Sequence, residues 1–74
     1  MINTLKSYRD AIGMTQAEAA KLLGISRQAY SEKERGKIPF KPREMVILKN
    51  KFLSVNSAIT IDELFFAGTY DEEV

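Results

Sequence analysis

Apolar side chains recur every three or four positions through most of the chain, which is the spacing of amphipathic helices and not of strands. Leu5, Tyr8 and Ile12 show this spacing near the start. A broader apolar face follows later, made by Met45, Val46, Ile47, Leu48 and Phe52. The pattern predicts no strong strand and five helices, over about residues 4–11, 16–23, 27–35, 43–52 and 61–67. Residues 53–59 mix apolar and small polar side chains, which favours a connector.

Residues that start and stop helices sharpen these bounds. Thr15 and Glu18 have the Thr-x-x-Glu spacing of a capping box, in which each side chain bonds to a backbone N–H near the helix start. Gly24 follows that helix at a position where a positive φ costs glycine little. Ser26 is the expected N-cap of the next helix, and Gly36 its expected stop. The last predicted helix carries the same features at Thr60, Glu63 and Gly68.

The helices over 16–23 and 27–35 form a unit, because only a tight turn at Gly24 separates them. Small side chains suit the place where two such helices touch, and Tyr30 suits an inward anchor; the small ones are Ala19, Ala20 and Ala29. The second helix carries polar side chains close to its start. In a helix-turn-helix the first helix crosses the DNA backbone, and the start of the second contacts base edges in the major groove. This segment therefore points to DNA.

Composition narrows the function classes. A chain of 74 residues fits one small domain, which we place at 1–68, followed by an acidic tail at 69–74. Neither histidine nor cysteine is present, so the usual general base and the commonest metal ligands are missing. We expect no enzyme activity, no metal, no cofactor and no small-molecule substrate. No apolar run approaches the roughly 20 residues that span a bilayer, and the N-terminus lacks a signal-peptide core. A bacterial cytoplasmic protein without membrane contact is the expectation.

The charge is small but unevenly distributed. The formal net charge is only +1, yet residues 1–43 hold nine Lys/Arg against four Asp/Glu. Residues 44–74 hold two Lys/Arg against six Asp/Glu. A basic front and an acidic back can orient a protein on a polyanion such as DNA. A chance distribution of surface charges remains the alternative.

The segment from Gly13 to Ser31, with its Thr-Gln-x-Glu-x-Ala-x-x-Leu-Gly-Ile-Ser string, resembles the Cro/CI-type (XRE-like) helix-turn-helix of phage repressors and bacterial regulators. Glu34-Arg35-Gly36-Lys37 and the closing segment 60–65 are similar to that family as well. The resemblance covers about residues 4–67. It implies an all-α, compact five-helix, lambda-repressor-like DNA-binding domain with the helix-turn-helix at its second and third helices.

The resemblance also implies roles for single residues. The positions that face bases are Arg27, Gln28, Ser31 and Glu32. Arginine pairs with guanine, glutamine with adenine, and glutamate can accept from cytosine. The positions that meet backbone phosphates are Gln16, Ser26, Arg35, Lys37, Lys41 and Arg43. Gln16 would also brace Gln28, and Arg9 would form an internal salt bridge with Glu34.

Two features depart from the family pattern. Lys33 stands where the family has an apolar residue that packs inward. Its stem could still cover apolar surface with the ammonium in water; the alternative is a rotated or shortened helix. Glu32 and Glu34 also bring negative charge close to the predicted phosphate surface.

The last helix carries adjacent aromatics that cannot both be fully buried against one small core. Phe65, Phe66 and the nearby Tyr70 are therefore candidates for a protein interface, with simple core packing as the alternative for one of them. The sequence predicts a sequence-specific transcriptional regulator, a repressor or Cro-like switch protein, bound to a double-stranded DNA operator as a homodimer. The alternative is a phage modulator or antirepressor that binds a partner repressor protein through the same fold.

Overall fold

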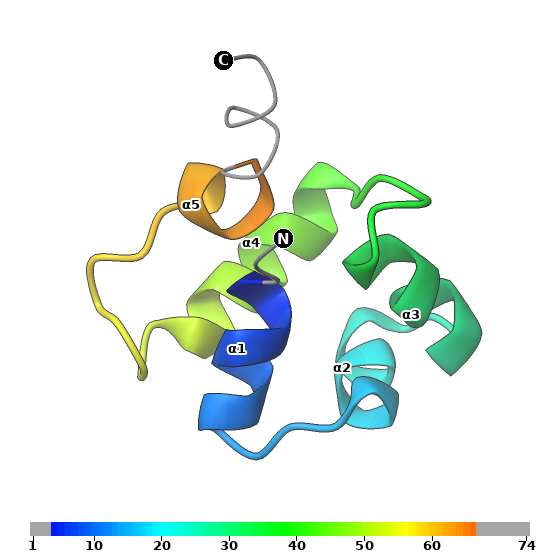
Figure 1. Cartoon of the computed structure of the whole chain (residues 1–74), viewed down its shortest axis with the longest axis horizontal. Helices are drawn as coiled ribbons and strands as arrows, with labels where there is room; N and C mark the ends of the chain where they lie inside the picture. Colours follow the sequence, from blue (N-terminus) through cyan, green and yellow to red (C-terminus); the bar gives the residue numbers. More distant parts are fainter. Residues whose placement is uncertain (1–3, 67–74) are drawn as a thin grey trace.

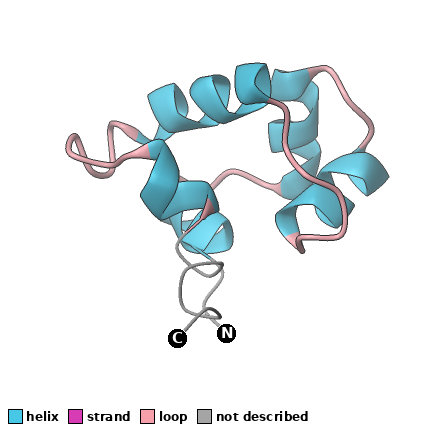
Figure 2. Cartoon of the chain, turned by 90° about the horizontal axis from the view of Figure 1, so that it is seen from above, coloured by secondary structure: helices cyan, strands magenta, loops and turns pink. Residues whose placement is uncertain are grey.

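A computed structural model describes residues 4–66, and helices are the only regular elements among them (Figure 2). The helices are α1 Thr4–Ala11, α2 Gln16–Leu23, α3 Arg27–Glu34, α4 Pro42–Phe52 and α5 Ile61–Phe65. The predicted all-α, five-helix fold is confirmed. The bounds differ slightly, because α3 ends one residue before the predicted Arg35 and α4 begins one residue earlier, at Pro42. α5 ends at Phe65, and the predicted end at residue 67 lies outside the described residues.

The turn between α2 and α3 follows from local chemistry. At the start of α2, the Thr15 side chain accepts from the Glu18 N–H at 3.1 Å, and the Glu18 carboxylate accepts from the Thr15 N–H at 2.8 Å. At its end, Gly24 adopts a φ of 73°. There the N–H groups of Gly24 and Ile25 bond back to the carbonyls of the last turn of α2. The predicted capping box and glycine stop are both confirmed.

The helices gather in two groups around α4 (Figure 1). α2 and α3 pack side by side on one side of the molecule, and α1 packs against α5 on the other. α4 contacts both groups, through α2 and through α5. The helix-turn-helix unit is therefore supported from behind by α4, while α3 keeps a side free of the other helices.

One cluster of buried side chains joins all five helices. Its members are Leu5, Met14, Ala19, Ala20, Leu23, Tyr30, Phe40, Leu48, Phe52, Ile59 and Leu64. Tyr30 is fully buried, so its predicted role as the inward anchor of α3 is confirmed. On α4, Leu48 and Phe52 are buried and Met45 and Ile47 partly so. Val46 was expected on that face but is 47% exposed, because α4 turns only one side toward the core.

Candidate nucleic-acid interface

The first turn of α3 is capped, and its polar side chains are free to contact a ligand. The Ser26 hydroxyl oxygen accepts from the Ala29 N–H at 3.1 Å, which fixes the helix start. Arg27 and Gln28 are exposed, and neither side chain forms a hydrogen bond or ion pair within residues 4–66. Ser31 and Glu32 follow one turn later and are half-buried. Residues four apart share a helix face, so the four predicted base-contacting residues lie together on one side of α3.

The last turn of α3 is held by a buried network centred on Glu34. Arg9 of α1 donates to both carboxylate oxygens of Glu34, from Nε at 2.8 Å and from Nη2 at 3.0 Å. Its remaining Nη1 donates to the Met14 carbonyl at 2.9 Å. The Tyr30 hydroxyl donates to Glu34 at 3.0 Å. The predicted Arg9–Glu34 salt bridge is confirmed, and it is buried and bidentate.

The network keeps Glu34 charged. Burial alone would raise the pKa of Glu34, but the hydrogen bonds from Arg9, Gln16 and Tyr30 outweigh it and lower that pKa. The hydrogen bond that Arg9 donates to Glu34 raises the pKa of Arg9. Burial raises the pKa of Tyr30, so its hydroxyl remains a donor. A buried charge pair whose members are hydrogen-bonded on several sides is costly to break from one side.

Gln16 differs from its predicted arrangement. Its amide Nε2 donates to Glu34 at 2.9 Å, and no hydrogen bond joins Gln16 to Gln28. The prediction that Gln16 braces Gln28 is therefore wrong for this structure, because the charged carboxylate is the stronger acceptor. An amide nitrogen carries two protons, so a second N–H of Gln16 remains for another acceptor. Gln16 is half-buried at the start of α2, which ties that helix terminus to α3.

The Lys33 side chain also lies in a different place from the one predicted. Its ammonium does not lie in water but donates to Glu44 of α4 at 2.6 Å, and both side chains are buried. The same Glu44 oxygen accepts from the Lys41 backbone N–H at 2.9 Å. Burial alone would raise the pKa of Glu44, but these bonds outweigh it and lower that pKa. Sequence reasoning missed Glu44; an inward-facing Lys33 needing a carboxylate partner was the available clue.

The predicted phosphate contacts beyond α3 lie close together in the chain. Arg35, Lys37, Lys41 and Arg43 are all exposed, and they occupy the α3–α4 connection and the first turn of α4. Gly36 ends α3 with a φ of 85°, and the Lys37 N–H bonds back to the Glu32 carbonyl at 2.9 Å. The structure thus brings four cationic side chains to the segment that follows α3.

The predicted protein-interface residues do not share one environment. Phe65 is half-buried and packs edge-on against Phe40 with ring centroids 5.1 Å apart, so it belongs largely to the core. Phe66, the C-cap of α5, is half-buried as well. Tyr70 lies outside the described residues, as do positions 69–74 of the predicted tail.

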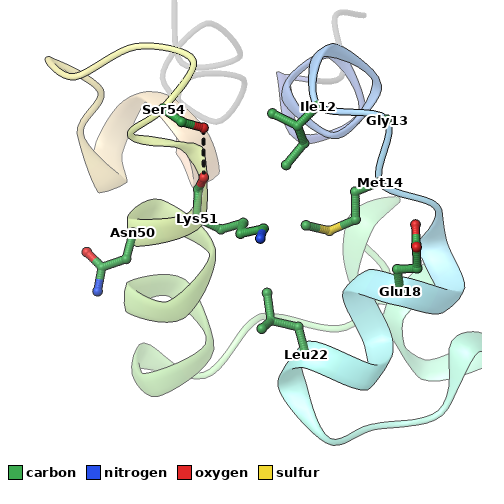
Figure 3. Close-up of a pocket in the computed structure, with 8 residues that line it drawn as sticks. All are labelled: Ile12, Gly13, Met14, Glu18, Leu22, Asn50, Lys51 and Ser54. Carbon is green, nitrogen blue, oxygen red and sulfur yellow. Dashed lines mark hydrogen bonds between the residues drawn. The ribbon is translucent and has the colours of Figure 1, made fainter.

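A pocket of about 510 Å³ opens between the α1–α2 turn, α2 and the end of α4 (Figure 3). Met14, Leu22 and Lys51 point into it, and Glu18 stands at its edge. None of the predicted DNA-contacting residues lines it. Within residues 4–66, no group of three metal-ligating side chains comes together, and no helix has the length and apolarity to cross a bilayer.

The chain matches a known protein family. The model of a family described as Helix-turn-helix matches residues 5–51, well over half of the chain. No curated protein and no solved structure matches. The matched span runs from α1 almost to the end of α4, so it includes both helices of the DNA-binding unit and both buried ion pairs. The chain belongs to the XRE-like, Cro/CI-type helix-turn-helix family and is a DNA-binding transcription regulator.

Proposed function

We propose that the protein is a sequence-specific operator-binding repressor, or a Cro-like switch protein, that places the first turn of α3 in the major groove. The observation that supports this most is the contrast between the two ends of α3: Arg27 and Gln28 in the first turn are exposed and make no hydrogen bond or ion pair within residues 4–66, whereas the last turn is buried and ion-paired through Glu34. A helix fixed at its last turn can hold its first turn steady against base edges. Arg27 would pair with guanine and Gln28 with adenine, while Glu32 would accept from cytosine.

Phosphate contacts would hold α3 in register. Gln16 and Ser26, at the starts of α2 and α3, sit where free N–H groups and the helix dipole favour an anion. Arg35, Lys37, Lys41 and Arg43 supply full positive charges beyond α3. Four Lys/Arg–phosphate contacts correspond to a slope of roughly −4 in a plot of log K against log salt.

A homodimer would match a two-fold operator, with two half-sites about 34 Å apart. Of the two described candidate interface residues, Phe66 remains for such a contact, since Phe65 is packed against Phe40. With no chemistry required, the protein would act in the bacterial cytoplasm by occupying its operator. Binding to a partner repressor is the competing proposal.

Selection from a pool of random DNA duplexes, followed by gel shifts of the selected duplexes, tests the proposal. We expect one enriched sequence, a salt slope near −4 and a shift to a two-protein complex on duplexes with paired half-sites. The DNA that flanks the protein's own gene is the natural second probe. No sequence preference, or a salt slope near zero, would contradict operator binding. A stable complex with a partner repressor, with DNA binding only in its presence, would support the competing proposal instead.

A further inference from the structure

The Lys33–Glu44 pair lies at the junction between α3 and α4. One oxygen of Glu44 accepts from the Lys33 ammonium at 2.6 Å and from the Lys41 N–H at 2.9 Å. Lys33 is in the last turn of α3, and Lys41 is the N-cap of α4. A single buried carboxylate therefore fixes the distance between the end of one helix and the start of the next.

The connection between these helices is held at further points. Its beginning is closed by the Lys37 and Ile38 N–H groups, which bond to the Glu32 carbonyl. Near its end, Phe40 is buried edge-on against the Tyr30 ring, with centroids 6.0 Å apart. Exposed cationic side chains extend from this fixed backbone, namely Arg35, Lys37, Lys41 and Arg43.

We propose that Lys33 and Glu44 are positioning residues for DNA binding: their buried pair sets the α3–α4 connection so that Lys37, Lys41 and Arg43 reach the phosphate backbone while α3 contacts the bases. The inference rests on the proposed operator binding. It goes beyond that proposal, because both side chains are buried and the pair adds no net charge to the surface.

The presence of a buried ion pair at the α3–α4 junction supports a geometric role for Lys33 and Glu44. Buried ion pairs are poor stabilisers, since desolvation offsets most of their attraction and well-packed apolar residues serve as well or better. A charged hydrogen bond, however, is short and directional, whereas an apolar contact tolerates sliding. Because Glu44 holds two donors with one oxygen, the side chain has little freedom to move without losing one of them.

The test is the double variant Lys33→Met/Glu44→Gln. Methionine keeps an unbranched stem of similar length, and glutamine keeps an acceptor for the Lys41 N–H, so no unpaired charge is left in the interior. We expect the variant to fold, with a helical circular-dichroism spectrum and a melting temperature close to that of the wild type. On the duplex selected by the wild type, we expect a salt slope less steep by about 2, because each lost phosphate contact removes about 0.9. Binding at low salt should weaken by about tenfold or more.

Two controls separate this role from general effects. Lys37→Gln removes one cation directly and should reduce the slope by about 0.9. Lys51→Met/Asp62→Asn removes the same two kinds of charge at exposed positions outside the connection, and should leave the slope unchanged. The base preference should stay that of the wild type in every variant, since the first turn of α3 is untouched.

A folded Lys33→Met/Glu44→Gln variant with the wild-type salt slope would overturn the inference. Glu44→Asp provides a second test, because it keeps the charge but shortens the reach by one methylene, so that both donors cannot be held as before. It should also lower the slope, and an unchanged slope there would contradict the positioning role. A wild-type protein without sequence preference or salt dependence would instead contradict the operator-binding proposal.

Discussion

The first and last turns of α3 differ sharply although only a few residues separate them. In the first turn, Arg27 and Gln28 are exposed and make no hydrogen bond or ion pair within residues 4–66. In the last turn, Lys33 and Glu34 are buried and paired with partners on two other helices. The first turn is available to a ligand, and the last turn fixes the helix to the rest of the domain. A helix built this way can present polar side chains without losing its orientation.

The largest effect on the fold is expected at Glu34, in the last turn of α3. Replacing Glu34 by alanine leaves Arg9 buried without its partner, which costs about 3–5 kcal/mol. A domain of this size has a total stability of only about 4–11 kcal/mol, so the variant should be largely destabilised. Urea denaturation followed by circular dichroism measures the loss. Glu32→Ala, a neighbouring half-buried glutamate without an ion pair among the described residues, is the matched control and should change stability by about 0.5 kcal/mol or less. Equal effects of the two variants would refute the proposed anchoring.

Lowering the pH should destabilise the domain by protonating the carboxylates that fix the last turn of α3. The pKa values of Glu34 and Glu44 are both lowered in the folded protein from the ordinary 4.5. Groups with a lowered folded pKa stabilise the fold above their unfolded pKa and lose that contribution as the pH falls through the folded value. We expect the melting temperature to fall steadily below about pH 4.5. Glu34→Gln, where it still folds, should show a shallower fall because one of the two groups no longer titrates. A melting temperature unchanged down to pH 3 would contradict this.

A substitution in the exposed first turn of α3 should change the affinity for DNA and leave the stability of the domain almost unchanged. Gln28→Ala should weaken binding to the selected duplex by about 1–3 kcal/mol and change binding to random DNA little. Its free energy of unfolding should stay within about 0.5 kcal/mol, because the side chain is exposed and makes no hydrogen bond within residues 4–66. Fluorescence anisotropy on both duplexes measures the difference. Asn50→Ala removes an exposed amide from α4 and should leave both affinities unchanged. Equal losses on both duplexes would show that Gln28 does not select bases.

The smallest effect is expected at Ser26, the N-cap of α3. Ser26→Ala removes the acceptor for the Ala29 N–H and should cost about 1 kcal/mol of stability. Ser57→Ala, at an exposed serine of the α4–α5 connector whose hydroxyl makes no bond in the described part of the chain, should be close to neutral. Thermal unfolding of both variants gives the comparison. A cost for Ser57→Ala as large as that for Ser26→Ala would argue against the cap.

The cap and the exposed side chains of the first turn of α3 were predictable from the sequence. Most of the side-chain partners in the last turn were not. Caps such as Ser26 and the Thr15–Glu18 box depend on residues three positions apart, so the sequence displays them directly. The Lys33–Glu44 partnership joins residues eleven apart on different helices, and only the packing of α3 against α4 reveals it. For the same reason Gln16 was assigned to Gln28, when the folded domain brings it to Glu34. The Arg9–Glu34 pair was anticipated through family resemblance, not through local pattern.

We expect the exposed side of α3 and the connection after it to form the DNA-binding surface. Amide chemical shifts of the uniformly labelled protein, followed by NMR during titration with the selected duplex, test this most directly. We expect the largest changes over residues 26–32 and 35–43, with small changes at Leu22, Asn50 and Ser54 around the pocket. Large changes at those pocket residues, together with unchanged signals from the first turn of α3, would contradict it.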